Sequence, residues 1–182
     1  MDGNSVTCAL HELFESQVIN HGDYSLVYAE PCGPGPALVL GYRHTSLELV
    51  LCPVQLVNLP RTRGDESRVA ARLAGPISSI DLSNVATMAD TGTGYQVHSV
   101  TGFHTGFEVE GSPRIAVDAS PFESSDGAVI VQQDEAVIVQ QDEAAEDFHQ
   151  FMAHFMDVLD AFYQVPDVHE IVQDTYTPSL AA

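Results

Sequence analysis

The spacing of apolar residues near the N-terminus predicts an amphipathic helix over residues 5–19. Apolar side chains recur every three or four positions: Val6, Leu10, Leu13, Phe14 and Val18. This interval is typical of a helix that packs one face against a core. The side chains of Asn4 and Ser5 can accept a hydrogen bond from the first turn, so we expect the helix to begin near them.

Three short apolar stretches follow, and we interpret them as strands of an antiparallel meander. They read YSLVYAE, ALVLGYR and SLELVLCPVQLVNL, separated by PCGPGP and by the polar residues 43–46. Their length, β-branched content and Gly/Pro boundaries favour strands. Pro53 is expected to mark the edge or the end of the third strand, because proline donates no hydrogen bond. Residues 95–122, with glycines at the turn points, predict a second β region.

Two further helices are predicted, a short one over residues 66–73 and a long one that Pro166 ends. On the long helix, apolar residues cover one continuous half of the surface: Phe148, Phe151, Met152, Phe155, Met156, Val158, Leu159, Phe162, Tyr163 and Val165. So wide a face either packs on the sheet or is shared with a second subunit. We therefore name Phe151, Phe155 and Phe162 as candidate partner-binding residues.

The octapeptide AVIVQQDE occurs twice in tandem, over residues 128–143. Its β-branched half favours a strand and its QQDE half favours a helix. We expect the first copy to form a strand or hairpin arm, and the second to lead into the C-terminal helix. The identity of the copies indicates a duplication in a tolerant surface segment. The predicted organisation is one domain over residues 1–166, with the repeat as a surface insertion and residues 167–182 as a partly disordered tail.

The charge of the chain is strongly negative. It has 26 acidic and 6 basic residues, a net charge of −20 and a pI near 4.3, and every basic residue is an arginine. Such a field repels phosphate backbones and anionic lipid, which argues against binding to duplex nucleic acid or to a membrane, and it suits a basic partner protein. Adaptation to a saline habitat explains the same excess, and this alternative stays open.

Other sequence features favour a cytoplasmic protein. The three cysteines are widely spaced and form no CxxC pair, which favours a reducing compartment over a disulfide framework. The acidic N-terminal residues do not resemble a secretion signal, and no apolar run approaches the length of a membrane span. We therefore predict a soluble cytoplasmic protein.

Few residues indicate chemistry. His98, His104 and Glu108 lie within HSVTGFHTGFEVEG, and two imidazoles with one carboxylate can form an open site for a divalent metal; a tight hairpin explains the same pattern. Arg63 and Asp65 belong to an RGD tripeptide, the adhesion motif that integrins bind, and are a second candidate for partner binding. The chain has no GxSxG, Walker-type or HExxH motif, so the sequence gives no support to an enzymatic function.

The predicted order of elements indicates an α+β fold, an antiparallel sheet with an N-terminal helix, a short middle helix and a long amphipathic C-terminal helix packed on it. This layout and the acidity resemble those of secretion-effector chaperones, which are dimers that bind partly unfolded clients. Our leading hypothesis is a non-enzymatic, homodimeric protein-binding module for a basic or aggregation-prone partner. The alternatives are a small-molecule or metal-binding β domain, with His98, His104 and Glu108 lining a pocket under the C-terminal helix, and an acidic mimic of nucleic acid.

Overall fold

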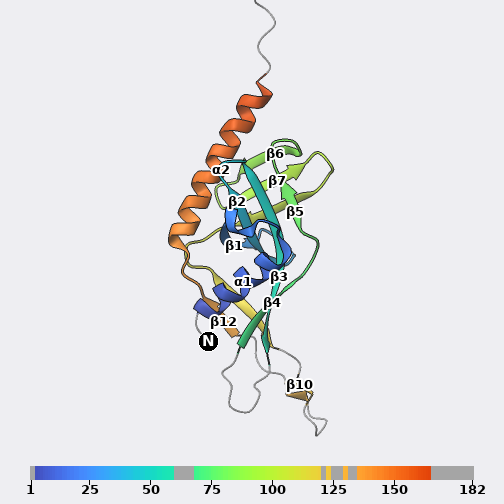
Figure 1. Cartoon of the computed structure of the whole chain (residues 1–182), viewed down its shortest axis with the longest axis vertical. Coiled ribbons are helices and arrows are strands. Elements are labelled where there is room, and N and C mark those ends of the chain that lie inside the picture. Colours follow the sequence, from blue (N-terminus) through green and yellow to red (C-terminus); the bar gives the residue numbers. More distant parts are fainter. Residues whose placement is uncertain (1–2, 60–67, 120–121, 124–128, 131–134, 165–182) are drawn as a thin grey trace, which may run out of the picture.

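The computed structural model describes residues 3–59, 68–119, 122–123, 129–130 and 135–164. Their order confirms a mixed α and β fold with a helix near each end (Figure 1). The elements are α1 (Gly3–Gln17), the 3₁₀ turn η1 (His21–Asp23), β1 (Ser25–Pro31), β2 (Ala37–Arg43), β3 (Glu48–Leu59), β4 (Arg68–Leu73), β5 (Ser78–Ile80), β6 (Val85–Asp90), β7 (Tyr95–Ser99), β8 (His104–Glu108), β9 (Arg114–Ala119), β10 (Phe122–Glu123), β11 (Val129–Ile130), β12 (Glu135–Ile138) and α2 (Asp142–Tyr163).

Strand β3 is the centre of a ten-stranded sheet whose main path runs β12-β9-β3-β2-β1-β8-β7-β6. One edge of β3 pairs with β2 over residues 48–54 and then with β9 at residues 57–58. The other edge pairs with β5 over residues 49–51 and with β4 over residues 54–59. The β3/β9 pairing is parallel, so the sheet is mixed and the prediction of a purely antiparallel sheet is wrong at this pair.

Pro53 lies inside β3 and does not end it, contrary to the sequence prediction. In a strand the N–H and C=O of one residue point to the same side. The carbonyl of Pro53 accepts a hydrogen bond from the Ala74 N–H on the β4 side, at 2.9 Å. The nitrogen of Pro53 is therefore on the same side, between Leu51, the last residue paired with β5, and Val54, the first residue paired with β4. No residue of either strand pairs with β3 at this position, so the absence of an N–H on Pro53 breaks no strand pairing.

The predicted middle helix is wrong over residues 68–73, which form β4. Every residue of β4 pairs with β3, from Arg68 opposite Leu59 to Leu73 opposite Val54. Alanine, arginine and leucine favour helix locally. Tertiary pairing outweighs this preference, because β4 satisfies the backbone of β3 along an edge that would otherwise lack partners.

Helices α1 and α2 pack on opposite faces of the central strands. Along β2, Leu38, Leu40 and Tyr42 belong to the core beneath α2, whereas Val39 belongs to the core beneath α1. Alternate residues of a strand point to opposite faces, so the continuous burial of residues 38–42 of β2 requires a cover on each side. The helices provide these two covers (Figure 1).

The apolar face of α2 is used inside the chain. Phe151 and Phe155 are fully buried, and the Phe151 ring lies 5.2 Å from that of Tyr42 between centroids. As a correction to the predicted partner surface, these two phenylalanines belong to the core. Phe162 is 70% exposed, at the end of α2 that extends beyond the sheet (Figure 1). No described helix has both the length and the apolar character needed to cross a membrane.

The two copies of AVIVQQDE have different structures. In the first copy, Val129–Ile130 pair with β10 in a separate two-stranded sheet. β12 begins at Glu135, the last residue of the first copy, and continues through Ile138 of the second copy; it pairs with β9. In the second copy, Val137 and Val139 are buried beneath α1, and α2 begins at Asp142. These findings confirm the predicted hairpin arm and the predicted lead into the C-terminal helix. The second copy contributes to the core, however, and is not part of a surface insertion.

We expect Gly41→Ala to destabilise the fold by about 1–3 kcal/mol, because a β-carbon at Gly41 would overlap the fully buried ring of Phe14. This cost exceeds the gain of about 0.4–1 kcal/mol that alanine gives by restricting the unfolded chain. Urea unfolding measures the change. Gly33→Ala is the matched control, because no atom lies within 4 Å of its added β-carbon. Equal stability of the two variants would contradict the predicted overlap.

Deleting either copy of the repeat gives the same sequence, and we expect this single-copy chain to fold with a free energy of unfolding within about 1 kcal/mol of the parent. The remaining copy can still supply three of the four residues of β12 and the start of α2, with Gly127 in the place of Glu135. In the single-copy chain, alanine at the position of Val137 should cost about 2 kcal/mol, because no second copy can replace the buried valine. Urea unfolding tests both values, and an unfolded single-copy chain would show that both copies are required.

Candidate functional site

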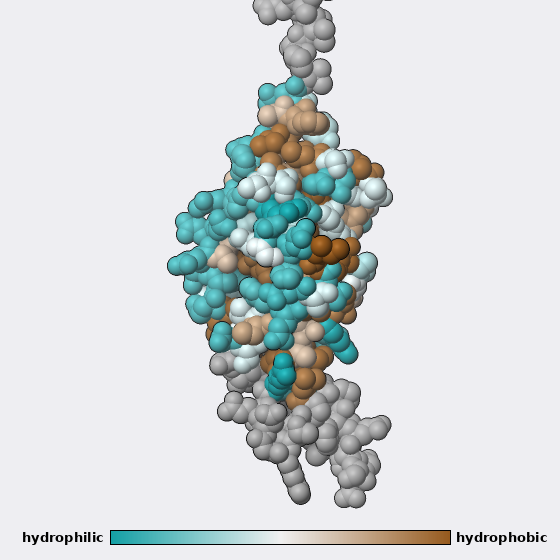
Figure 2. Space-filling view, in the orientation of Figure 1, coloured by the Kyte–Doolittle hydropathy of each residue, from teal (hydrophilic) through white to brown (hydrophobic). Residues whose placement is uncertain are grey.

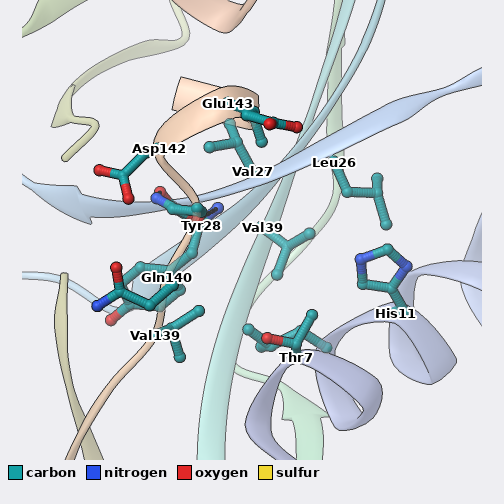
Figure 3. A pocket seen from close by; sticks show the side chains of 13 residues that line it. Thr7, His11, Leu26, Val27, Tyr28, Val39, Val139, Gln140, Asp142 and Glu143 are labelled. Carbon is teal, nitrogen blue, oxygen red and sulfur yellow. Dashed lines mark hydrogen bonds between the residues drawn. The ribbon is translucent and has the colours of Figure 1, made fainter. Parts of the chain in front are cut away.

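A cleft of about 520 Å³ lies between α1 and the start of α2, over β1 and β2 (Figure 3). Its floor is mostly apolar and its rim is polar. The lining residues are Thr7, Leu10 and His11 from α1, Leu26, Val27 and Tyr28 from β1, Val39 from β2, and Val139 to Ala144 at the start of α2. The volume is in the range of pockets that bind small molecules or single side chains of a partner.

The side chain of Gln141 joins the start of α2 to the edge of β1. Its Oε1 accepts a hydrogen bond from the Tyr28 N–H at 2.9 Å, and its Nε2 donates to the Tyr28 carbonyl at 2.9 Å. Nε2 also donates to the carbonyl of Glu110 at 2.7 Å. The side-chain amide therefore takes the place of a neighbouring strand at one residue of β1.

The backbone of Leu26 remains open at the floor of this cleft. The backbone N–H and C=O of Tyr28 point away from β2. Leu26 is two residues earlier on the same strand, so its backbone N–H and C=O point away from β2 as well. Strand β8 pairs with β1 only at Glu30 and Pro31. Among the described residues, none bonds to the backbone of Leu26 on this side. A donor and an acceptor are thus available to an incoming strand.

Carboxylates form one side of the rim. Asp142 and Glu143 occupy the first turn of α2, and neither has an ion-pair partner in the described part of the chain. Negative charge at this end also stabilises the helix dipole, which is a structural reason for their presence. His11 reaches the cleft from α1, across from Asp142 (Figure 3).

A second polar group holds α2 one turn further along. Tyr42 donates a hydrogen bond to Asp147 Oδ2 at 2.8 Å, and His44 Nε2 lies 3.2 Å from both carboxylate oxygens. Burial would raise the pKa of Asp147, but the hydrogen bonds from Tyr42 and His44 outweigh it and lower the pKa below its ordinary value. Desolvation and the bond to Asp147 raise the pKa of Tyr42. Asp147 is therefore an ionised anchor for α2 at neutral pH.

The structure brings together two of the three predicted metal ligands. His98 and His104 are opposite each other on β7 and β8, and their ring centroids are 5.8 Å apart. Glu108 lies four residues beyond His104 on β8, a separation of about 13 Å along the strand. Glu108 therefore cannot share an ion with this pair. Within the described ranges, no three His, Cys, Asp or Glu side chains form a metal-binding group.

A second cavity, of about 640 Å³, contains His98, His104 and Cys32, and none of its lining residues comes from α2. The prediction that these histidines lie under the C-terminal helix is thus wrong. Desolvation and the adjacent Glu108 raise the pKa of the Cys32 thiol, which disfavours the reactive thiolate. The other predicted partner residues, Arg63 and Asp65, lie outside the described residues.

Sequence reasoning missed the main residues of the cleft. Gln141 and Leu26 are 115 positions apart in sequence, and nothing local marks either as part of a site. The only available signal was the QQDE run before the C-terminal helix, because acidic residues are typical of a first helical turn. That signal indicates a helix start and does not show which strand the helix start contacts.

We expect Gln141→Ala to lower the free energy of unfolding by about 1–3 kcal/mol, because it leaves the N–H and C=O of the partly buried Tyr28 backbone without their partner. Gln140→Ala is the matched control, because Gln140 is an exposed neighbour with one bond, from Ser112. Thermal unfolding followed by circular dichroism compares the two variants. Equal losses would show that Gln141 does not hold α2 to β1.

Comparison of the chain with models of protein families, with curated proteins and with solved structures found no match. The comparisons therefore supply no activity or partner by similarity. The cleft itself, with its apolar floor, its open backbone at Leu26 and its carboxylate rim, is the feature from which a function can be inferred.

Proposed function

We propose that the protein is a binding module that holds an extended, cationic segment of another protein in the cleft between α1 and α2. The observation that carries this proposal is the open backbone of Leu26 at the floor of a cleft with an acidic rim. An extended peptide pairs with such an edge through its main chain, and alternate side chains enter the pocket beside it. One apolar side chain packs on Leu10 and Val39.

Electrostatics support a basic partner. Asp142 and Glu143 are at the rim, no arginine lines the cleft, and the chain contains no lysine. Lysine or arginine beside the apolar anchor would meet unpaired carboxylates, and the net charge of −20 attracts such a segment from a distance. The visible face of the molecule is mostly hydrophilic, interrupted by separate apolar areas (Figure 2).

This proposal keeps the protein-binding class that the sequence favours and changes the surface. The phenylalanines that the sequence suggested for partner binding lie mainly in the core, whereas the cleft is open. Such a site would bind a partner through its main chain, one apolar side chain and its positive charge, and would not require one particular sequence. This mode of binding fits a chaperone-like role for a basic or aggregation-prone partner. Homodimer formation is a separate proposal, for which Phe162 offers exposed aromatic surface.

The test uses a fluorescent peptide with a central Val-Leu-Val flanked by lysines, titrated with the protein at low salt and followed by anisotropy. Saturable binding to the parent is expected. Asp142→Asn with Glu143→Gln should weaken it about 2- to 30-fold, because exposed charge pairs contribute about 0.2–1 kcal/mol each. Asp157→Asn with Asp160→Asn is the matched control, because both residues are exposed on α2 away from the cleft.

Two further peptides separate strand pairing from simple charge attraction. A peptide with methylated backbone nitrogens at the three central residues should bind about tenfold more weakly, because it cannot donate to the edge of β1. A glutamate-flanked peptide should not bind. Equal binding of the methylated peptide would refute pairing at Leu26, and equal effects of the two double substitutions would place the peptide elsewhere.

A further inference from the structure

The turn between β7 and β8 fixes how its two histidines face each other. The Ser99 N–H donates to the Phe103 carbonyl at 2.8 Å, so Ser99 directs its N–H toward the neighbouring strand, as in a hydrogen-bonded pair; the Phe103 N–H donates to Ser99 Oγ at 3.2 Å. Hydrogen-bonded and non-hydrogen-bonded pairs alternate along an antiparallel ladder. The next pair, His98 opposite His104, is therefore of the non-hydrogen-bonded kind, in which Cα atoms are about 4.5 Å apart and side chains are closest.

The separation of the two rings suits a shared ion. An imidazole nitrogen binds zinc at about 2.0–2.1 Å, so two imidazoles on one tetrahedral ion have ring centroids roughly 5–6 Å apart. The centroids of His98 and His104 are 5.8 Å apart, with an angle of 39° between the ring planes. The two rings thus already have a spacing that one ion bridges, with small changes of side-chain torsion.

The surroundings leave room for the remaining coordination positions. Both imidazoles are exposed and line the cavity of about 640 Å³, whose lining residues contain no carboxylate. Thr87 lies opposite His98 on β6, and Gln96 is two residues away on the same face of β7. Neither histidine has a hydrogen-bond partner or an ion pair in the described part of the chain. Both nitrogens of each ring are therefore available, and water can complete the coordination.

We propose that His98 and His104 form a two-histidine site for a divalent transition metal such as zinc. The strongly negative field of the chain raises the local concentration of cations. Imidazole nitrogens then select a borderline transition metal over the magnesium and calcium that carboxylates bind. The site is separate from the cleft between α1 and α2, so it does not depend on the proposed partner binding.

Calorimetric titration with zinc alone tests the site, on untagged protein carrying Cys8→Ser and Cys32→Ser, because both thiols are exposed and bind zinc themselves. One equivalent should bind at neutral pH. His98→Gln and His104→Gln should each weaken zinc binding about tenfold or more. His154→Gln is the matched control, an exposed histidine on α2.

Two further measurements decide between the outcomes. Thermal unfolding shows whether each variant folds, and NMR of the histidine ring nitrogens should show zinc-dependent shifts at His98 and His104 in the parent even if a variant fails to fold. Equal zinc affinity in the His98, His104 and His154 variants would overturn the proposal. So would zinc binding no tighter than magnesium binding, since that would indicate surface carboxylates alone.

Discussion

The two hydrogen-bonding edges of β3 are the constraint on which the rest of the structure depends. Each edge pairs with two different strands in succession, β2 then β9 on one side and β5 then β4 on the other. A single strand of twelve residues thus fixes the positions of four others. Residues 49–52 of β3 are buried on both faces of the sheet, so each face must be covered. α1 covers one face and α2 covers the other.

The start of α2 shows how this framework creates a site. α2 follows β12, which pairs with β9 and so is positioned indirectly by β3. Gln141 then completes the connection to Tyr28, and Asp147 holds the next turn through Tyr42. The helix is fixed at its beginning while β1 keeps one open backbone position beside it. The cleft is a consequence of a sheet edge that one side chain covers only in part.

The excess of acidic residues has structural consequences. Arg43, which stacks on Tyr24 with 4.6 Å to the ring centroid, also pairs with Glu48 at the start of β3. Desolvation would raise the pKa of Glu48, yet bonds from Arg43, Tyr24 and Ser79 lower it. With so few cations in the chain, most carboxylates have no such partner. Those at the cleft therefore remain available to a cation from outside.

Much of the local structure could be predicted from the sequence. The period of the apolar residues predicted both terminal helices, and the Gly/Pro boundaries located the first three strands. The errors have a common cause. Residues 68–73 have helical propensity, and Pro53 is a local signal for a strand end, but pairing with distant strands decided both. The predicted three-residue metal site was wrong for a similar reason: Glu108 is close to His104 in sequence, but the extended strand between them keeps the two side chains far apart.

The tandem repeat shows most clearly what local sequence determines and what only tertiary structure determines. The sequence determined that each AVIVQQDE copy has a strand-forming half and a helix-starting half, since these are properties of neighbouring residues. Local sequence cannot decide which copy pairs with β9, because the two copies are identical. Only the tertiary structure assigns Val137 and Val139 to the core and Gln141 to Tyr28. The physical reason is that strand pairing and burial depend on partners far away in the chain, which local propensity does not contain.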